Sequence, residues 1–218
     1  MKVMVVGDIH SEFGMLNTLM NRRPTDITIV CGDIAYFWCG ENAKYKIKPK
    51  GKVYLVPGNH EDYFTMQRVV GRHSFNPVEL EENVFWCPIG SSINVNDTKI
   101  LFVGGAESHD KNQRMFMVDW FPEEVLNSKD VDFILDNTDR ADIIISHTAP
   151  LAFDVKLDFD YRTDPTRHAL SILLEKFKPS LWYFGHFHKY ITGIHKNTKW
   201  TGLNMIQDCS RYFEILNI

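Results

Sequence analysis

The sequence predicts an α/β fold, with either one mixed sheet or two sheets packed face to face and helices on the outside. Three observations support this prediction: strand-like apolar runs alternate with helical segments in the first part of the chain, closely spaced strands follow near residues 84–103, and alternation then returns. Parallel strands joined by helices and antiparallel strands joined by short turns would then occur in the same structure.

Ten short runs rich in Val, Ile, Leu and aromatic residues have the composition and length of strands. They cover residues 2–6, 26–31, 52–56, 84–88, 92–95, 99–103, 141–145, 180–184, 190–195 and 212–216. Helices are expected at residues 12–21, 62–70, 122–135 and 165–177. The last helix has a clear start signal, because Asp164 can cap it and Pro165 suits its first position. Its apolar positions are Ala169, Ile172, Leu173 and Phe177.

The composition is that of a globular protein with a sizeable core. The 218 residues fit a single domain spanning residues 1–218, and 44% hydrophobic with 24% charged residues excludes the disordered and collagen-like classes. A formal net charge of -4 argues against broad attraction to nucleic acid or anionic lipid. The lysine-containing connection at residues 40–51 is expected to be a solvated loop rather than a phosphate contact.

The sequence favours a cytoplasmic protein without membrane contact. The N-terminal apolar run gives way to GDIH too early for a secretion signal, and no stretch approaches the length of a membrane span. The cysteines at positions 31, 39, 87 and 209 form no CxxC pair and no regular spacing, which argues against a disulfide framework or a cysteine zinc site. Cys31 is expected to be a small buried side chain.

Five predicted strands end in Asp, Asn or His, and glycine precedes these residues at four of the ends. The sequences are GDIH at residues 7–10, GD at 32–33, GNHE at 58–61, SH at 146–147 and GHFH at 185–188. Ligands bind outside the carboxyl ends of strands in open α/β sheets, because the loops diverge there, and glycine lets the backbone approach a ligand closely. Asp8 and His10 are two positions apart, so their side chains can reach one ion together.

These strand ends carry the donor atoms of a metal site. Asp, His and Asn suit divalent transition metals, and the set lacks the thiolates of a structural zinc site. Seven such ligands are too many for one ion but suit two ions if one carboxylate bridges them. Manganese is the ion expected first, with iron, zinc, cobalt and nickel as alternatives.

In order along the chain, these motifs resemble the five motifs of the calcineurin-like metallophosphoesterase family, and the matched positions extend from Asp8 to His188. The resemblance implies a four-layer α/β/β/α sandwich of two mixed β-sheets flanked by helices, with a dinuclear metal centre at the sheet edges. It assigns one ion to Asp8, His10 and His188, the other ion to Asn59, His147 and His186, and the bridging position to Asp33.

The resemblance also implies a catalytic role for His60. The expected nucleophile is a hydroxide that bridges the two ions, because metal coordination brings the pKa of water towards neutrality. An imidazole can donate to a developing alkoxide, so His60 is expected to stabilise or protonate the leaving group. Glu61 and Asp62 either orient His60 or begin the next helix, where acids favour the helix dipole, and we favour the helix interpretation.

The second motif departs from that of the family's protein phosphatases, which usually read GDxVDRG with an arginine that binds phosphate. This chain reads GDIAYFW at residues 32–38, without an arginine. We therefore expect a metal-dependent phosphoesterase that favours a phosphodiester, with a nucleotide or nucleic acid as a candidate substrate. A phosphomonoesterase acting on phosphoprotein or nucleotides is the alternative. A non-catalytic scaffold is less favoured, because all seven expected ligands and His60 are present.

Several assignments stay open at the level of sequence. The aromatic residues Tyr36, Phe37 and Trp38 either stack on a base or aryl group or pack in the core or a lid. The glycine-rich strand end at residues 104–106 and the segment 107–110 after it form either a structural turn, which we favour, or part of the site. The arginines that could replace the missing phosphate-binding arginine are Arg22, Arg72, Arg114 and Arg162. The sequence does not choose among them, and it leaves the oligomeric state open.

Overall fold

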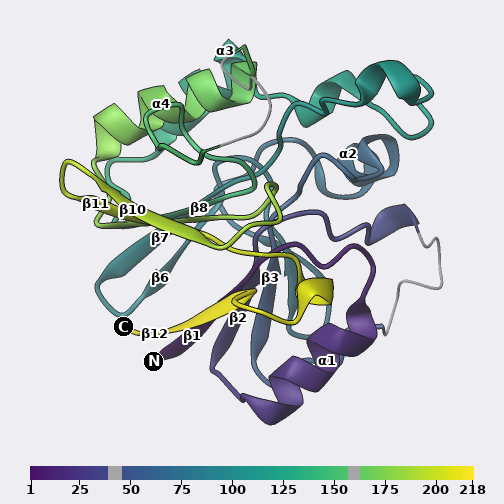
Figure 1. Ribbon diagram of the computed structural model, residues 1–218, viewed down its shortest axis with the longest axis vertical. Helices are drawn as coiled ribbons and strands as arrows, with labels where there is room; N and C mark the ends of the chain where they lie inside the picture. The colour runs from purple at the N-terminus through teal and green to yellow at the C-terminus, as the bar shows by residue number, and fades with distance from the viewer. Residues whose placement is uncertain (39–45, 157–162) are drawn as a thin grey trace.

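A computed structural model describes residues 1–38, 46–156 and 163–218, and its strands form two six-stranded sheets (Figure 1). The first sheet contains, in spatial order, β12 (Phe213–Asn217), β1 (Lys2–Val6), β2 (Ile27–Val30), β3 (Lys52–Leu55), β5 (Val84–Trp86) and β4 (Val78–Glu81). The second contains β10 (Ile191–His195), β11 (Thr198–Gly202), β9 (Leu181–Phe184), β8 (Ile143–Ser146), β7 (Thr98–Val103) and β6 (Ser92–Val95). Both sheets are mixed, with parallel central pairs and antiparallel pairs at their edges.

Helices cover the outer face of each sheet. The first sheet packs against α1 (Phe13–Arg22) and α2 (Tyr63–Val70), and the second packs against α3 (Ser128–Asn137) and α4 (Pro165–Phe177). Short 3-10 helices occur in the described part of the chain at Lys111–Gln113, Pro122–Glu124 and Ile206–Asp208. Among the described residues, no helix is both long enough and apolar enough to cross a membrane.

Alternation along the strands produces the layers. Val3 and Val5 face the second sheet, where they pack in one cluster with Ile145, whereas Met4 and Val6 face the helices of the first sheet. Successive strand residues point to opposite faces, so a strand covered on both faces is apolar throughout. Each sheet therefore contributes to an inner and an outer apolar layer, and the predicted four-layer α/β/β/α sandwich is confirmed.

Helix starts follow capping chemistry. Asp164 accepts a hydrogen bond from the backbone N of Thr166 at 2.8 Å, which confirms the expected start of α4. The prediction that Ile172 lies on the apolar face of α4 is wrong, because Ile172 is exposed. The buried positions include Ala169, Leu170, Leu173 and Leu174.

The predicted helix at 122–135 is wrong at its start. Pro122 begins only a short 3-10 turn, and α3 begins at Ser128 because Asn127 and Asp130 form a reciprocal capping box. Two strands were also missed. β4 is an edge strand with two glutamates among its four residues, and β11 has the mixed sequence TKWTG, so neither has a strong apolar signal.

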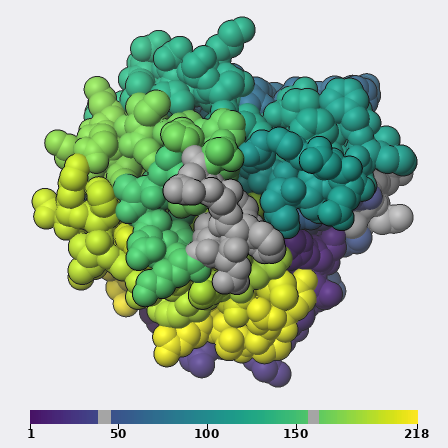
Figure 2. Space-filling model, turned by 45° about the horizontal axis from the view of Figure 1, so that its top comes forward, coloured from purple at the N-terminus to yellow at the C-terminus, as the bar shows by residue number. Residues whose placement is uncertain are grey.

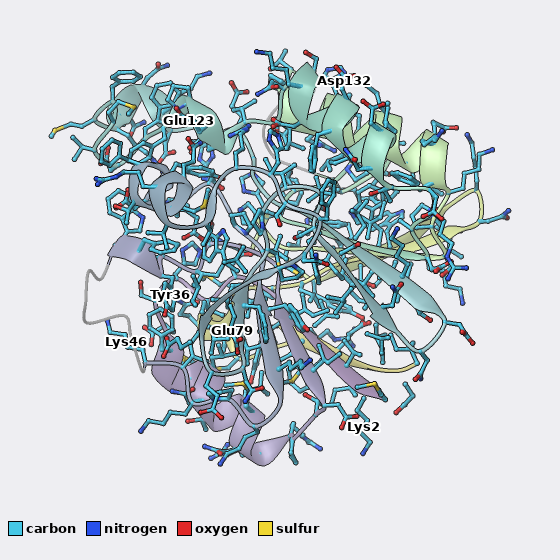
Figure 3. The ribbon with its side chains drawn as sticks, turned by 180° about the vertical axis from the view of Figure 1, so that it is seen from behind. Lys2, Tyr36, Lys46, Glu79, Glu123 and Asp132 are labelled. Carbon is cyan, nitrogen blue, oxygen red and sulfur yellow. The ribbon has the colours of Figure 1, made fainter. Side chains whose placement is uncertain are left out.

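The basic connection lies against α1 where the structure describes it. Lys46 accepts a hydrogen bond from Asn17 at its backbone O and places its ammonium 5.5 Å from the ring of Phe13. Figure 3 shows Lys46 and Tyr36 at the left of the view, below Glu123. These contacts agree with the loop interpretation. Lys44, Cys39 and Arg162 lie outside the described residues.

Candidate metal centre

The polar strand ends meet at one edge of the sandwich. β1, β2 and β3 run parallel in the first sheet, and β8 and β9 run parallel in the second. Hydrogen bonds join the loops that follow them: the backbone N of His186 donates to both carboxylate oxygens of Asp8 at 3.1 and 2.9 Å, and Nδ1 of His147 lies 2.9 Å from the carbonyl O of Cys31. Motifs from both sheets therefore form one cluster.

The open half of this cluster consists of Asp8, His10 and His188. Nε2 of His188 lies 3.1 Å from Oδ2 of Asp8 and 2.9 Å from Nε2 of His10. Asp33 is adjacent, and one donor atom from each of these four residues lies within 4.8 Å of the others. The hydrogen bond to Asp8 raises the pKa of His188, although burial opposes it. The side chains of His10 and His188 are 25% and 39% exposed, so solvent reaches this half.

The buried half consists of Asn59 and His147, which are buried, and His186, which is half-buried. Nε2 of His147 lies 2.9 Å from Oδ1 of Asn59, and the ring of His186 lies 4.9 Å from that of His147. Asp33 lies between the halves, with Oδ1 3.3 Å from Nε2 of His147 and Oδ2 3.7 Å from Nε2 of His10. The structure thus brings all seven predicted ligands together, with Asp33 in contact with both groups.

The donor atoms of the buried half fit a cation. Nδ1 of His147 faces the carbonyl O of Cys31 and carries a hydrogen there, so Nε2 presents a lone pair to the oxygens of Asp33 and Asn59. Three acceptors that converge in a buried place need a positive charge, which a proton or a metal ion can supply. Burial opposes a charge on His147, but Asp33 and Asp8 outweigh it and raise its pKa to about 9. Burial alone would raise the pKa of Asp33, yet His147 holds it well below its usual value.

The backbone of the cluster is strained. Four of the predicted ligands have left-handed backbone angles, with φ of 40° at His10, 46° at Asp33, 66° at His186 and 45° at His188. Residues with a side chain adopt this region reluctantly, and such strain persists only where the surroundings enforce it. The concentration of strain at these residues is typical of a functional site.

The glycines of the motifs make room for side chains of other motifs. A Cβ at Gly185 would lie 1.9 Å from Oδ1 of Asp8, and one at Gly32 would lie 2.0 Å from Nδ1 of His147. Gly32 also has φ of 118°, which residues with a Cβ rarely adopt. The sequence alone predicts that these glycines let the backbone approach a ligand. In the structure they let the side chains of Asp8 and His147 lie close to the backbone of another motif.

Glu61 and Asp62 have separate roles. Asp62 caps α2, accepting a hydrogen bond from the backbone N of Thr65 at 3.0 Å, as the helix interpretation predicts. That interpretation is wrong for Glu61, which is fully buried and accepts from the backbone N of Ile34 at 2.7 Å and of Ala35 at 3.0 Å. Burial raises the pKa of Glu61 to about 8. Glu61 therefore ties the loop after β2 to the loop after β3.

His60 lies beside the cluster, in contact with Arg114. Its backbone N donates to Oδ1 of Asp33 at 2.9 Å, and its ring lies 5.5 Å from that of His10. Nη2 of Arg114 lies 2.8 Å from Nε2 of His60. An arginine can only donate, so Nε2 accepts and the ring hydrogen is at Nδ1. Burial lowers the pKa of His60 and Asp33 opposes this effect, while Arg114 adds to it.

Two buried residues outside the motifs support Asn59. Its amide nitrogen donates to Oγ of Ser108 at 3.0 Å, and the backbone N of Ser108 donates to Oε1 of Glu124 at 2.6 Å. Burial raises the pKa of Glu124 to about 7. The interpretation of residues 107–110 as a structural turn does not account for this support, which fits the alternative that the segment forms part of the site. The glycines at residues 104–105, which resemble the other motif glycines, were the signal that could have found it.

The aromatic residues after Asp33 divide between the core and the site. Tyr36 is buried and donates a hydrogen bond to Glu81, and Phe37 packs against Trp86 with ring centroids 5.1 Å apart. Trp38 is 40% exposed, and its Nε1 donates to the backbone O of His60 at 3.1 Å. Core packing therefore explains the first two, and only Trp38 contacts the site residue.

Comparisons with known proteins agree with the arrangement of the motifs. The family model for calcineurin-like phosphoesterases matches residues 1–190, and no curated protein matches the sequence. A dimetal phosphatase from Danio rerio is similar in structure, with 12% sequence identity, a TM-score of 0.59, and coverage of 98% of this chain and 91% of that chain. The TT1561 protein of Thermus thermophilus has 12% identity, a TM-score of 0.53, and coverage of 99% and 98%. At these identities the structural likeness shows a shared fold.

Proposed function

Because this chain belongs to the calcineurin-like phosphoesterase family, we propose that it hydrolyses a phosphoester with two divalent metal ions held by the Asp–His cluster. The observation that carries this proposal is the position of Asp33, whose two carboxylate oxygens face His10 and His147 in different halves of the cluster. A carboxylate with one oxygen towards each group of donors suits a bridging ligand.

Each half offers a separate set of donors. The first ion would be held by Asp8, His10 and His188, the second by Asn59, His147 and His186, with Asp33 shared between them. Manganese is the proposed ion, and the mixed oxygen and nitrogen donors also suit iron, zinc, cobalt and nickel. Bound there, the ions would supply Lewis acidity and acidify coordinated water.

His60 is the proposed catalytic side chain. It contacts Asp33 through its backbone and lies at the edge of the open half, so it can reach the oxygen of a departing group. The contact with Arg114 occupies Nε2 in the absence of substrate. Once Arg114 has turned from His60 to the substrate, Nε2 would be free to take up a proton from water and to donate it to the departing oxygen.

A phosphodiester is the favoured substrate, and a nucleotide or nucleic acid is the candidate source. The loop after β2 places Trp38 beside His60 where protein phosphatases of the family have an arginine motif. Arg114 is paired with Asp110 at 2.9 Å, so the pair adds little net positive charge. This balance suits the single negative charge of a diester better than the double charge of a monoester.

The test is hydrolysis of bis(p-nitrophenyl) phosphate and p-nitrophenyl phosphate by chelator-stripped protein before and after addition of Mn²⁺. The proposal predicts turnover that appears with Mn²⁺ and favours the diester. An Asp8→Asn variant purified in parallel controls for contaminating enzymes and should be inactive. Preference for the monoester would instead support the phosphatase alternative, and bound metal without turnover on either ester would support a scaffold.

A further inference from the structure

We propose that Arg114 binds a non-bridging oxygen of the substrate's phosphate beside His60. This inference rests on the proposed phosphoesterase function and names the side chain that recognises the substrate. Arg114 belongs to the segment between β7 and α3, which forms a lobe beside α2, drawn in teal at the upper right of Figures 1 and 2.

Arg114 is held in place before any substrate arrives. Nη2 lies 2.9 Å from Oδ1 of Asp110, and Nη1 donates to the backbone O of Asp119 at 3.4 Å. The side chain is only 9% exposed although its backbone lies in a surface segment. A guanidinium fixed in this way loses little conformational entropy when it binds an anion.

The imidazole of His60 lies between the guanidinium of Arg114 and the proposed metal ligands. Nη2 is 2.8 Å from Nε2 of His60, whose backbone N is 2.9 Å from Oδ1 of Asp33 and whose ring is 5.5 Å from that of His10. A phosphate bound at the open half would therefore lie next to both His60 and Arg114. Arginine suits this position because its planar fork of N–H groups matches phosphate oxygens.

Donors remain available for that contact. A guanidinium carries five N–H groups, and the contacts to Asp110, Asp119 and His60 use three of them. The hydrogen bond to His60 can also be exchanged for a charge-assisted one to phosphate, which is stronger than a bond to a neutral imidazole. Binding of phosphate at Arg114 would at the same time release Nε2 of His60.

The other candidate arginines in the described residues are placed elsewhere. Arg72 forms two hydrogen bonds with the buried carboxylate of Asp130 and donates to the carbonyl oxygens of Glu123 and Val125. Arg22 is exposed in the last turn of α1. Of the three candidate arginines in the described residues, Arg114 is the one that contacts His60, and this contact joins residues 54 positions apart, so no local pattern in the sequence indicates it.

The experiment compares Arg114→Gln with Arg140→Gln, a control that removes an arginine bonded to the backbone O of Asp97. Binding of inorganic phosphate to the Mn²⁺-loaded protein is measured by calorimetry, together with metal content and the KM for the diester. Loss of one or two charge-assisted hydrogen bonds should weaken phosphate binding by about 10- to 100-fold in Arg114→Gln and raise KM. Metal content should not change, and Arg140→Gln should behave like the wild type.

A second variant tests the same contact in the opposite direction. Asp110→Asn removes the carboxylate that competes for the guanidinium, so phosphate should bind several-fold more tightly than to the wild type. Wild-type phosphate affinity in Arg114→Gln at normal metal content would overturn the inference. If the wild type binds phosphate through Arg114 but hydrolyses neither ester, the proposed function fails while the assignment of Arg114 stands.

Discussion

The two halves of the Asp–His cluster differ in their access to solvent. In the buried half, His147 is 0% and Asn59 is 4% exposed and His186 is half-buried, whereas the side chains of His10 and His188 in the open half are 25% and 39% exposed beside the buried carboxylate of Asp8. Hydrogen bonds also orient two donors of the buried half, because His147 donates to the carbonyl O of Cys31 and Asn59 donates to Oγ of Ser108. Supporting hydrogen bonds fix the orientation of ligands and strengthen metal binding.

This difference assigns separate tasks to the two halves. The buried half is expected to hold its ion tightly and to release it slowly, because its donors are oriented and shielded from water. The open half is expected to exchange its ion and to meet the substrate, since the ring of His60 lies beside that of His10 and Arg114 contacts His60. Substitutions in the two halves should therefore differ in their effects on metal content, turnover and stability.

The largest effect is expected from Asp33→Asn, which weakens both halves at once. Asn is almost the same shape and tolerates the left-handed backbone at this position, where φ is 46°. Loss of the carboxylate charge should reduce metal affinity and turnover by at least about 100-fold. Metal analysis and diester hydrolysis measure both losses. Full metal content with near-wild-type turnover would contradict the assignment of Asp33 as the bridging ligand.

His147→Ala and His188→Ala should each remove one ion, with unequal effects on stability. At neutral pH the metal-free protein holds His147 and Asp33 as a buried ion pair, since the pKa of His147 is raised to about 9. Breaking such a pair lowers the free energy of unfolding by about 3–5 kcal/mol. Removal of the half-exposed His188 side chain should lower it by less than about 1 kcal/mol. Urea unfolding of the metal-free variants measures the difference, and equal costs would argue against the distinction between the halves.

Gly185→Ala should damage the open half through packing alone. The new methyl group would meet Oδ1 of Asp8 at 1.9 Å, so the carboxylate must move. Overpacking of this kind costs about 1–3 kcal/mol and should weaken the ion at the open half. Gly14→Ala is the matched control, because nothing lies within 4 Å of its added Cβ and it lies in α1. It should stabilise the protein by about 0.5–1 kcal/mol, and thermal unfolding with metal analysis checks both.

Glu124→Gln should change the pH dependence of stability without removing an ion. The folded-state pKa of Glu124 is raised to about 7 from an ordinary value of 4.5, so the folded protein binds this proton more tightly than the unfolded chain does. Its contribution to stability is therefore present at low pH and is lost as the pH rises from about 4.5 to about 7. The loss should be about 1–3 kcal/mol in the metal-free protein, and the Gln variant should lack it. Identical pH profiles from urea unfolding would contradict this assignment.

The sequence predicted the parts of the molecule that have local signals. Each strand end combines an apolar run with an adjacent polar motif, so the five motifs were found on the loops where the structure has them, and Asp164 with Pro165 marked the start of α4. β4 and β11 were missed because their strands contain charged and polar residues and depend on their neighbours in the sheet.

The remaining features of the site depend on contacts between distant residues. The glycines at residues 104–105 can mark this strand end as part of the site, but no local pattern shows that Ser108 supports Asn59, which lies 49 positions away. The purpose of Gly185 is visible only when Asp8 is placed against it, and the left-handed backbone of His10 is enforced by tertiary packing. Local patterns could therefore identify the donors, but not the difference between the buried and open halves.

The most direct test of this difference is the release of metal from wild-type protein loaded with Mn²⁺ and then exposed to a chelator, followed by ion analysis over time. Two ions per chain, one lost quickly and one slowly, are the predicted result, and His147→Ala should abolish the slow phase. A single ion per chain, or two ions that leave at the same rate, would contradict a cluster built from one open and one buried half.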